Sequence, residues 1–333
     1  MSTPSAPTAY PPVSVVMPVL NEEHHLPEAV GSVLAQDYPG GLEVVVAVAP
    51  SRDRTREVAD ELAAADPRVV VVDNPSGRTP DGLNAAIGAT SHDVVVRMDG
   101  HGALSVGYVR RAVEILEETG AANVGGIMLA EGTGDLQQAV AVAMRSPLGI
   151  GSARFHVGGR PGPADTVYLG VFRREWLRRV GGYDPAFVRA QDWELNHRIR
   201  EAGGTVWFTP ELTVTYRPRE TWGELTRQFF TTGQWRREVV RRHPGTLNRR
   251  YLAPPVAVAL VAAGTVAGLV WRPLWALPLG YAVAVTAGGA WAARDERAAV
   301  LLRTPAVMAV MHMTWGAGFL LGTSAPRSTG RPR

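Results

Sequence analysis

Three long apolar segments near the C-terminal end place the strongest constraint on how this chain can fold. They are residues 252–270, 274–293 and 306–321. The first two approach the ~20 residues that a helix needs to cross a bilayer, whereas the third is short unless residues 298–302 extend it past Arg303. Helices of a soluble bundle would need polar surface toward water, and neither these apolar segments nor the short connections between them provide it. The sequence therefore predicts a membrane anchor of two to three helices at residues 251–323.

Arginines are distributed unevenly around these segments. Six precede the first segment, namely Arg236, Arg237, Arg241, Arg242, Arg249 and Arg250. Arg294 and Arg297 follow the second segment, and Arg272 lies between the two. By the positive-inside rule the N-terminal part of the chain and residues 294–303 lie in the cytoplasm, where the arginines would also attract anionic lipid headgroups. A third crossing would put the tail arginines outside, against that rule, so an interfacial or re-entrant third segment stays open.

The two ends of the chain lack any folding pattern. The first twelve residues are rich in Pro, Ser, Thr and Ala, without the basic start and apolar core of a secretory signal peptide. We expect disorder at residues 1–12 and again in the tail, residues 324–333.

Between these ends, apolar runs typical of strands alternate with amphipathic helical patterns. The expected strands are residues 13–20, 42–49, 68–73, 93–98 and 124–128, and the expected helices are residues 22–35, 54–65, 82–89, 109–120, 173–180 and 192–201. This alternation predicts an α/β domain at residues 13–250, with a mostly parallel sheet covered by helices on both faces. Ligands of such sheets bind beyond the carboxyl ends of the strands. Residues 149–166, rich in Gly, Pro and Arg, are expected to form a long loop.

Composition limits the chemistry. The net charge of +3 is too small to indicate a nucleic-acid partner. The chain has no cysteine, so disulfides, thiolate metal ligands and thiol nucleophiles are excluded. A metal ion would have to be held by carboxylate, imidazole or phosphate.

Asp99, Gly100 and His101 follow the strand expected at residues 93–98. A carboxylate and an imidazole separated by one small residue can hold Mg²⁺ or Mn²⁺, with the remaining positions filled by phosphate and water. Such an ion would neutralise charge on a departing diphosphate. The alternative is an ordinary aspartate that ends a strand in a turn or caps a helix.

A second group of polar residues opens the helix expected at residues 192–201. Asp192 could cap this helix, or it could act as a general base that accepts a proton from an attacking hydroxyl. Glu194 points to a different helix face, so the two carboxylates are not interpreted as a pair. Asp192 is the better candidate for the base.

Taken in order, these motifs resemble glycosyltransferase family 2, the inverting transferases with the GT-A fold, over about residues 13 to 245. The stretches that carry the resemblance are 13–23, 31–39, 51–55, 83–87, the metal motif 96–101 and the pair Gln191-Asp192. Within the family the chain is similar to membrane-bound transferases of the succinoglycan-biosynthesis type, through residues 123–126, 145–149, 172–175 and 191–200. That likeness implies transfer onto a lipid-linked saccharide. Together with the apolar segments and the arginines around them, we expect a multi-pass protein of the cell membrane with a cytoplasmic catalytic domain.

The resemblance implies a specific reaction and specific residues. A sugar would pass, with inversion, from a nucleotide-diphospho-sugar, expected to be UDP-linked, to a hydroxyl of a lipid-linked saccharide during exopolysaccharide or cell-envelope glycan synthesis. Asp192 would be the catalytic base, and Asp99 and His101 would hold Mg²⁺ or Mn²⁺. The expected donor-binding residues are Pro18, Asn21, Glu22, Asp53, Arg78, Asn84 and Asp99. The expected acceptor-binding residues are Gly170, Gln191, Trp193 and Trp235; Trp235 could equally be an aromatic residue of the membrane interface.

Two alternatives stay open. Transfer onto a polyprenyl phosphate would need no general base, because that acceptor is already an anion. A non-catalytic, membrane-tethered subunit that binds nucleotide or glycan is suggested by Val48 and Ala49, where family members often carry two aspartates. A processive polymerase is less favoured, because residues 231–235 keep only the tryptophan of the processive motif.

Overall fold

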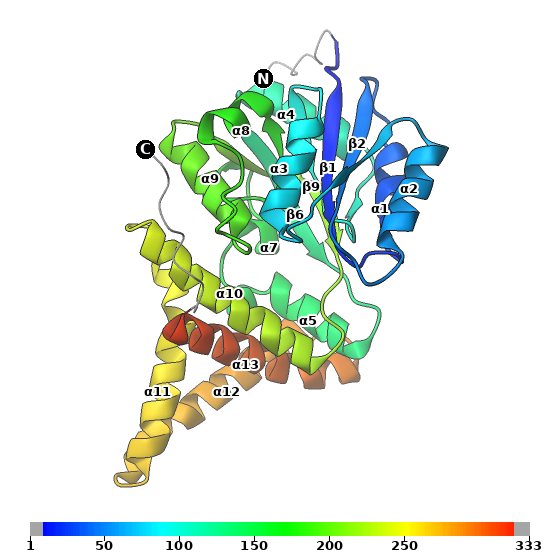
Figure 1. The fold of residues 1–333 in the computed structure, drawn as a ribbon. Coiled ribbons are helices and arrows are strands. Elements are labelled where there is room, and N and C mark those ends of the chain that lie inside the picture. The colour runs from blue at the N-terminus through cyan, green and yellow to red at the C-terminus, as the bar shows by residue number, and fades with distance from the viewer. Residues whose placement is uncertain (1–8, 323–333) are drawn as a thin grey trace, which may run out of the picture. The chain divides into compact units, whose positions relative to one another are not determined.

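A computed structural model describes residues 9–322, which form two compact units (Figure 1). The α/β unit comprises residues up to Leu129 together with Gly158–Tyr216. The helical unit comprises Ala130–Val157 and the chain from Arg217 onward. Residues 130–157 and 217–250 thus belong with the apolar helices, although the sequence pattern assigned them to the α/β domain. The expectations for residues 1–8 and 324–333 lie outside the described residues.

The first half of the α/β unit is a parallel sheet in the strand order β3-β2-β1-β4. Its strands are β1 (Val13–Val19), β2 (Leu42–Val48), β3 (Val69–Asp73) and β4 (Val94–Arg97), and its helices are α1 (Leu26–Leu34), α2 (Thr55–Ala65) and α3 (Thr79–Ala89). The strands are valine-rich, and most of their side chains are buried, as expected for strands covered on both faces. β1 pairs with both β2 and β4, so the ends of these strands lie at one edge of the sheet.

The second half adds antiparallel strands, in the order β4-β8-β6-β9-β5, with β7 paired to β9. The elements are β5 (Ala103–Leu104), α4 (Tyr108–Thr119), β6 (Asn123–Ala130), β7 (Gly162–Pro163), β8 (Tyr168–Arg173), α8 (Arg174–Val180), α9 (Gln191–Glu201) and β9 (Val206–Tyr216). The sheet is therefore mixed. β8 and β9 were not expected, because alternation along the sequence reports parallel strands joined by helices and says nothing of strands paired through distant contacts.

The helical unit contains the predicted apolar helices. Its elements are α5 (Asp135–Arg145), α6 (Pro147–Ile150), α7 (Arg154–Val157), α10 (Trp222–Arg242), η1 (Arg249–Tyr251), α11 (Ala253–Gly268), η2 (Arg272–Trp275), α12 (Ala276–Ala292) and α13 (Ala298–Leu321). Among the described residues, three segments are long and apolar enough to cross a membrane: Arg249–Gly268, Arg272–Ala292 and Ala298–Leu321. The predicted loop at 149–166 is only partly a loop, because α6, α7 and β7 lie wholly or partly within it.

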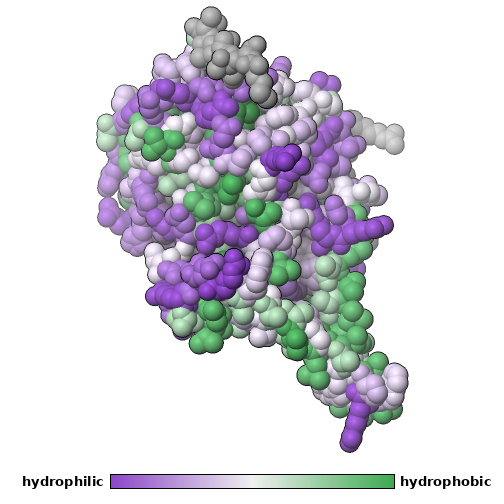
Figure 2. All heavy atoms as spheres, turned by 180° about the vertical axis from the view of Figure 1, so that it is seen from behind, coloured by the Kyte–Doolittle hydropathy of each residue, from purple (hydrophilic) through white to green (hydrophobic). Residues whose placement is uncertain are grey.

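Large apolar side chains of α11 and α12 face outward. Val266, Leu279 and Val283 are each at least 60% exposed. Figure 2 shows hydrophobic surface along this part of the molecule, with hydrophilic surface at its far end. Apolar helices without a protein partner on most of their surface are suited to a lipid environment.

Glycines allow α10 and α13 to pack backbone against backbone. A Cβ built on Gly233 of α10 would lie 2.0 Å from the Trp315 carbonyl oxygen of α13, and one on Gly318 would lie 2.0 Å from the Phe230 carbonyl oxygen. Small residues of this kind permit close helix contacts where apolar side chains alone give little specificity.

Gly233→Ala is expected to destabilise this contact by about 1–3 kcal/mol, because a methyl group that meets backbone must push the helices apart. Gly223→Ala on the same helix is the matched control, since nothing lies within 4 Å of its Cβ position. Melting of the detergent-solubilised chain should show a lower Tm for Gly233→Ala alone. Equal Tm values for the two variants would show that the close contact is absent in solution.

Candidate active site

The residues expected to hold a metal form a tight turn beyond β4. The N–H of Gly102 donates to the Asp99 carbonyl oxygen at 3.0 Å, which closes a β-turn over Asp99–Gly102. A Cβ built on Gly100 would lie 2.7 Å from Val19 Cγ1 and 3.3 Å from Glu22 Cγ. The turn is therefore packed directly on the end of β1.

Gly100→Ala is expected to lower stability by about 1–3 kcal/mol, because Val19 is buried and its short side chain has no room to move away. Gly88→Ala, in an exposed position of α3 with nothing within 4 Å, should instead stabilise the helix by about 1 kcal/mol. Chemical unfolding of the full chain in detergent would measure both. A neutral Gly100→Ala would show that the turn is looser than described.

His101 is held by a carboxylate from the first strand end. Its Nδ1 lies 2.7 Å from Glu22 Oε1, and His25 Nδ1 lies 3.3 Å from Glu22 Oε2. The Glu22 N–H in turn donates to Thr55 Oγ1 at 2.7 Å. A carboxylate bonded to one ring nitrogen orients the imidazole, as it does for histidines that bind metals.

The loops after β1 and β2 are joined by reciprocal hydrogen bonds. Asn21, with a positive φ of 56°, donates its N–H to Ser51 Oγ at 3.1 Å and accepts the Arg52 N–H on Oδ1 at 2.8 Å. Asp53 accepts the Glu23 N–H at 3.2 Å and the Thr55 hydroxyl at 2.5 Å. Burial raises the pKa of Asp53, but these hydrogen bonds outweigh it and leave the pKa below its ordinary value. Asn21, Glu22 and Asp53 thus shape this edge of the sheet.

A buried arginine brings the two central carboxylates together. Arg97, the last residue of β4, donates from Nη2 to Asp99 Oδ1 at 3.0 Å and forms an ion pair with Asp192 through Nη1. The Arg97 side chain is 4% exposed, whereas those of Asp99 and Asp192 are 23% and 25% exposed. Burial lowers the pKa of Arg97, but the negative charge of Asp99 and the other nearby groups outweigh it and leave the pKa raised. The guanidinium therefore stays charged between the two acids.

Asp192 does not cap its helix. α9 begins at Gln191, and the preceding residue, Ala190, has a positive φ of 58°. Asp192 lies in the first turn of α9, where the helix dipole favours its negative charge. The cap alternative is therefore wrong.

Buried polar contacts set the position of α9. Arg198 donates to both carboxylate oxygens of Glu194 at 2.7 Å, and to the carbonyl oxygens of Val180 and Gly182. On the same helix, Asn196 accepts from Asn123 of β6 at 2.7 Å. α9 is thereby held both to the segment after α8 and to the sheet.

Asn84 has a structural partner. Its side-chain amide donates to the Tyr183 carbonyl oxygen at 2.7 Å and accepts the Tyr183 N–H at 2.8 Å. Arg78, at the start of α3, donates to Asp81 at 2.6 Å. Both residues are engaged within the protein, so their contact with a donor stays a prediction.

The remaining predicted residues are placed as follows. Pro18 is a partly buried residue of β1, and Gly170 lies in β8 with a φ of 121° and a Cβ position 2.5 Å from Asn123 Oδ1. Gln191 and Trp193 open α9, and the Trp193 ring stacks on His197 with centroids 5.3 Å apart. Trp235 is buried in α10 of the helical unit. Their contact with an acceptor stays a prediction.

Arg97 is the residue of this candidate site that sequence reasoning missed. The signal was present, because an arginine directly follows three buried valines in β4. A charge at such a position needs a partner. Which carboxylates supply it follows only from the fold, since Asp192 is far away in the sequence.

Comparison with known proteins decides the family. The sequence matches the family described as glycosyl transferase family 2 over residues 14–181. The chain is also 34% identical over 310 residues to the succinoglycan biosynthesis protein ExoA of Rhizobium meliloti (strain 1021), which covers 92% of this chain and 93% of that protein. The chain belongs to glycosyltransferase family 2.

Other matches agree with this membership. A dolichyl N-acetyl-alpha-D-glucosaminyl phosphate 3-beta-D-2,3-diacetamido-2,3-dideoxy-beta-D-glucuronosyltransferase of Methanococcus voltae is 22% identical over 251 residues, 73% of this chain and 77% of that protein. Among solved structures, the mannosyltransferase PcManGT from Pyrobaculum calidifontis, in complex with GDP-Man and Mn²⁺, matches with a TM-score of 0.59 and 21% identity, over 95% of this chain and 87% of that one. The protein is thus a glycosyltransferase with the GT-A fold and candidate membrane helices at its C-terminal end.

Proposed function

We propose that this family 2 member transfers a sugar with inversion from a nucleotide-diphospho-sugar, UDP-linked, to a hydroxyl of a lipid-linked saccharide. The observation that carries the proposal is the bridge from Arg97 to both Asp99 and Asp192 beyond β4. The bridge brings two carboxylates within reach of one guanidinium. Asp99 is suited to a role beside the diphosphate of the donor, and Asp192 is suited to a role beside the acceptor. Such an arrangement suits a single displacement between two substrates.

In the proposed reaction Asp192 accepts the proton of the acceptor hydroxyl as its oxygen attacks the anomeric carbon. The bond from that carbon to the diphosphate oxygen breaks on the opposite face, so the configuration inverts. Arg97 pairs with Asp192 and fixes the direction of its carboxylate. A base within hydrogen-bond reach of the attacking hydroxyl is the geometric requirement for this role.

The same edge of the sheet offers two of the ligands that a divalent cation would need. Asp99 and His101 would hold Mg²⁺ or Mn²⁺, and within residues 9–322 no group of three or more His, Asp or Glu side chains is placed to hold a metal by itself. An ion that takes its other ligands from a diphosphate needs few protein ligands. When bound, the ion would neutralise negative charge on the leaving diphosphate. The structural neighbour in complex with GDP-Man and Mn²⁺ supports a divalent ion as cofactor.

The acceptor is proposed from the membrane helices and the relatives. One relative is named for succinoglycan biosynthesis and another for action on a dolichyl-linked sugar phosphate. An acceptor embedded in the bilayer suits a transferase with exposed apolar helices. The arginines around α11 and α12 support a cytoplasmic catalytic part and, with it, a role in exopolysaccharide or cell-envelope glycan synthesis.

The proposal is tested with membranes that contain the full chain, its native lipids as acceptors, and a panel of labelled UDP- and GDP-sugars. Label should enter lipid-extractable product from one UDP-sugar, vanish with EDTA, and return with Mn²⁺ or Mg²⁺. Absence of transfer from every donor, with tight nucleotide binding retained, would favour a non-catalytic subunit. Undiminished transfer by Asp192→Asn would favour an anionic acceptor such as a polyprenyl phosphate.

A further inference from the structure

α11 and α12 form an antiparallel hairpin whose two ends carry different residues. A Cβ on Gly264 of α11 would lie 2.8 Å from Leu277 Cβ of α12, and Gly268 lies against Trp275. The turn of the hairpin therefore lies around residues 269–275, with Arg272 in it. At the opposite end, Tyr251 precedes α11 and Trp291 lies in the last turn of α12. Aromatic residues near both ends are typical of helices that cross a bilayer.

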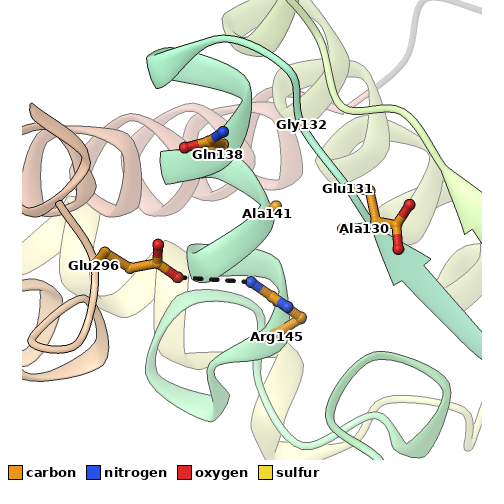
Figure 3. A pocket seen from close by; sticks show the side chains of 7 residues that line it. All are labelled: Ala130, Glu131, Gly132, Gln138, Ala141, Arg145 and Glu296. Atoms are coloured by element: carbon orange, nitrogen blue, oxygen red, sulfur yellow. Dashed lines mark ion pairs between the residues drawn. The ribbon is translucent and has the colours of Figure 1, made fainter.

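The start of α13 is bound to α5. This contact lies at the end of the hairpin that is opposite to its turn. Arg297 pairs with Asp135 at 2.5 Å and donates to Gln138 at 3.0 Å, while Arg303 lies 3.4 Å from Asp135. Glu296, in the connection from α12, lies 4.0 Å from Arg145 at the end of α5. Figure 3 shows this ion pair at a polar pocket of about 340 Å³ in the helical unit.

The middle of α13 contacts α6. His312 Nε2 lies 2.9 Å from the Leu148 carbonyl oxygen. α6 has four residues and follows α5 directly, so it is no part of a membrane hairpin.

The end of α13 is bound to the residues that lead into α11. The Trp315 ring stacks on Tyr251 with centroids 6.4 Å apart, and a Cβ on Gly316 would lie 2.5 Å from the Pro254 carbonyl oxygen. Gln234 of α10 donates to the Gly322 carbonyl oxygen at 2.7 Å. Arg237 of α10 donates to the carbonyl oxygens of Phe319 and Leu320, which satisfies helix-end groups that have no partner within α13.

These contacts are incompatible with a third crossing. A helix of 24 residues is about 36 Å long, so a crossing would carry its end to the far side of a ~30 Å hydrocarbon layer. Instead both ends of α13 contact elements on one side of the α11–α12 hairpin. α13 also has the largest buried share of the three apolar segments, 33% against 17% and 6%.

We infer that α13 lies along the lipid surface together with α5 and α10, that the described chain crosses the membrane only through α11 and α12, and that Gly322 ends on the side of α5. Without a third crossing, the conflict with the positive-inside rule no longer arises. The inference concerns relative sides of the membrane and holds whatever the sugar donor or acceptor.

The absence of cysteine makes a direct test possible, because each introduced thiol is the only one in the chain. Three single variants are compared in sealed vesicles of both orientations: Ser324→Cys in the tail, Asp295→Cys between α12 and α13, and Val270→Cys in the hairpin turn. Asp295 and Val270 are exposed, with 85% of the Asp295 side chain and 93% of Val270 accessible. Each variant is treated with a membrane-impermeant maleimide before and after detergent.

Ser324→Cys and Asp295→Cys should react in the same vesicle orientation, and Val270→Cys in the other. A second tail variant, Ser328→Cys, repeats the measurement at another position of the tail. Reaction of the tail thiols from the Val270 side would establish a third crossing and overturn the inference. Tail thiols that react only after detergent in both orientations would overturn it as well.

Discussion

Asp192→Asn is expected to lower the turnover number for sugar transfer by about 10²–10⁴-fold, the range associated with loss of a general base. The amide keeps the size of the carboxylate but accepts no proton at neutral pH. Donor affinity should change little, because the proposed step for Asp192 involves the acceptor hydroxyl. Initial rates with a saturating UDP-sugar, together with nucleotide binding by titration, separate the two effects.

The control for this variant is Asp165→Asn, which makes the same chemical change at an exposed carboxylate of the α/β unit. It should retain wild-type turnover. If Asp192→Asn loses donor affinity and turnover equally, Asp192 serves the donor site and the assignment as base fails.

Arg97→Met is expected to lower stability by about 3 kcal/mol, the lower end of the loss expected when one partner is removed from a buried ion pair. Arg97 is buried, while Asp99 and Asp192 each keep about a quarter of their side chains exposed, and this moderates the cost. Turnover should fall as well, since two neighbouring carboxylates would repel each other and lose their alignment. Arg97→Lys keeps the charge but not the fork that reaches both acids, so it should recover stability better than activity.

A double-mutant cycle isolates the bridge. Arg97→Met combined with Asp192→Asn should be less destabilising than the sum of the single changes, because the second change removes part of the repulsion. Arg174→Met is the matched control, since Arg174 is a buried arginine that donates to the carbonyl oxygens of Ile87 and Thr90. Its effect should add to that of Asp192→Asn. Additivity for both arginines would contradict a direct interaction between Arg97 and Asp192.

Much of the parallel half of the fold could be predicted from the sequence, because burial on both faces requires continuous apolar runs and the covering helices show their own period. β1 to β4 were found within two residues of their observed ends. The helix expected at residues 22–35 begins only at Leu26, since Asn21 to Glu23 hydrogen-bond to the neighbouring loop instead. β8 and β9 were missed because antiparallel partners are selected by contacts that no local period records.

For the site, the sequence by itself determined which residue types stand where: an Asp-Gly-His turn after a buried strand, an aspartate at the start of a helix, and three apolar segments flanked by arginine. Only the tertiary structure decided how they combine. Asp99 and Asp192 meet at Arg97 because β4 and α9 are brought together by the sheet and by the contacts of Asn196 and Arg198. α13 stays on one side because both its ends bind other helices. The physical reason is the same in both cases: composition and period report what a segment can bury, whereas its partner depends on distances that only the folded chain defines.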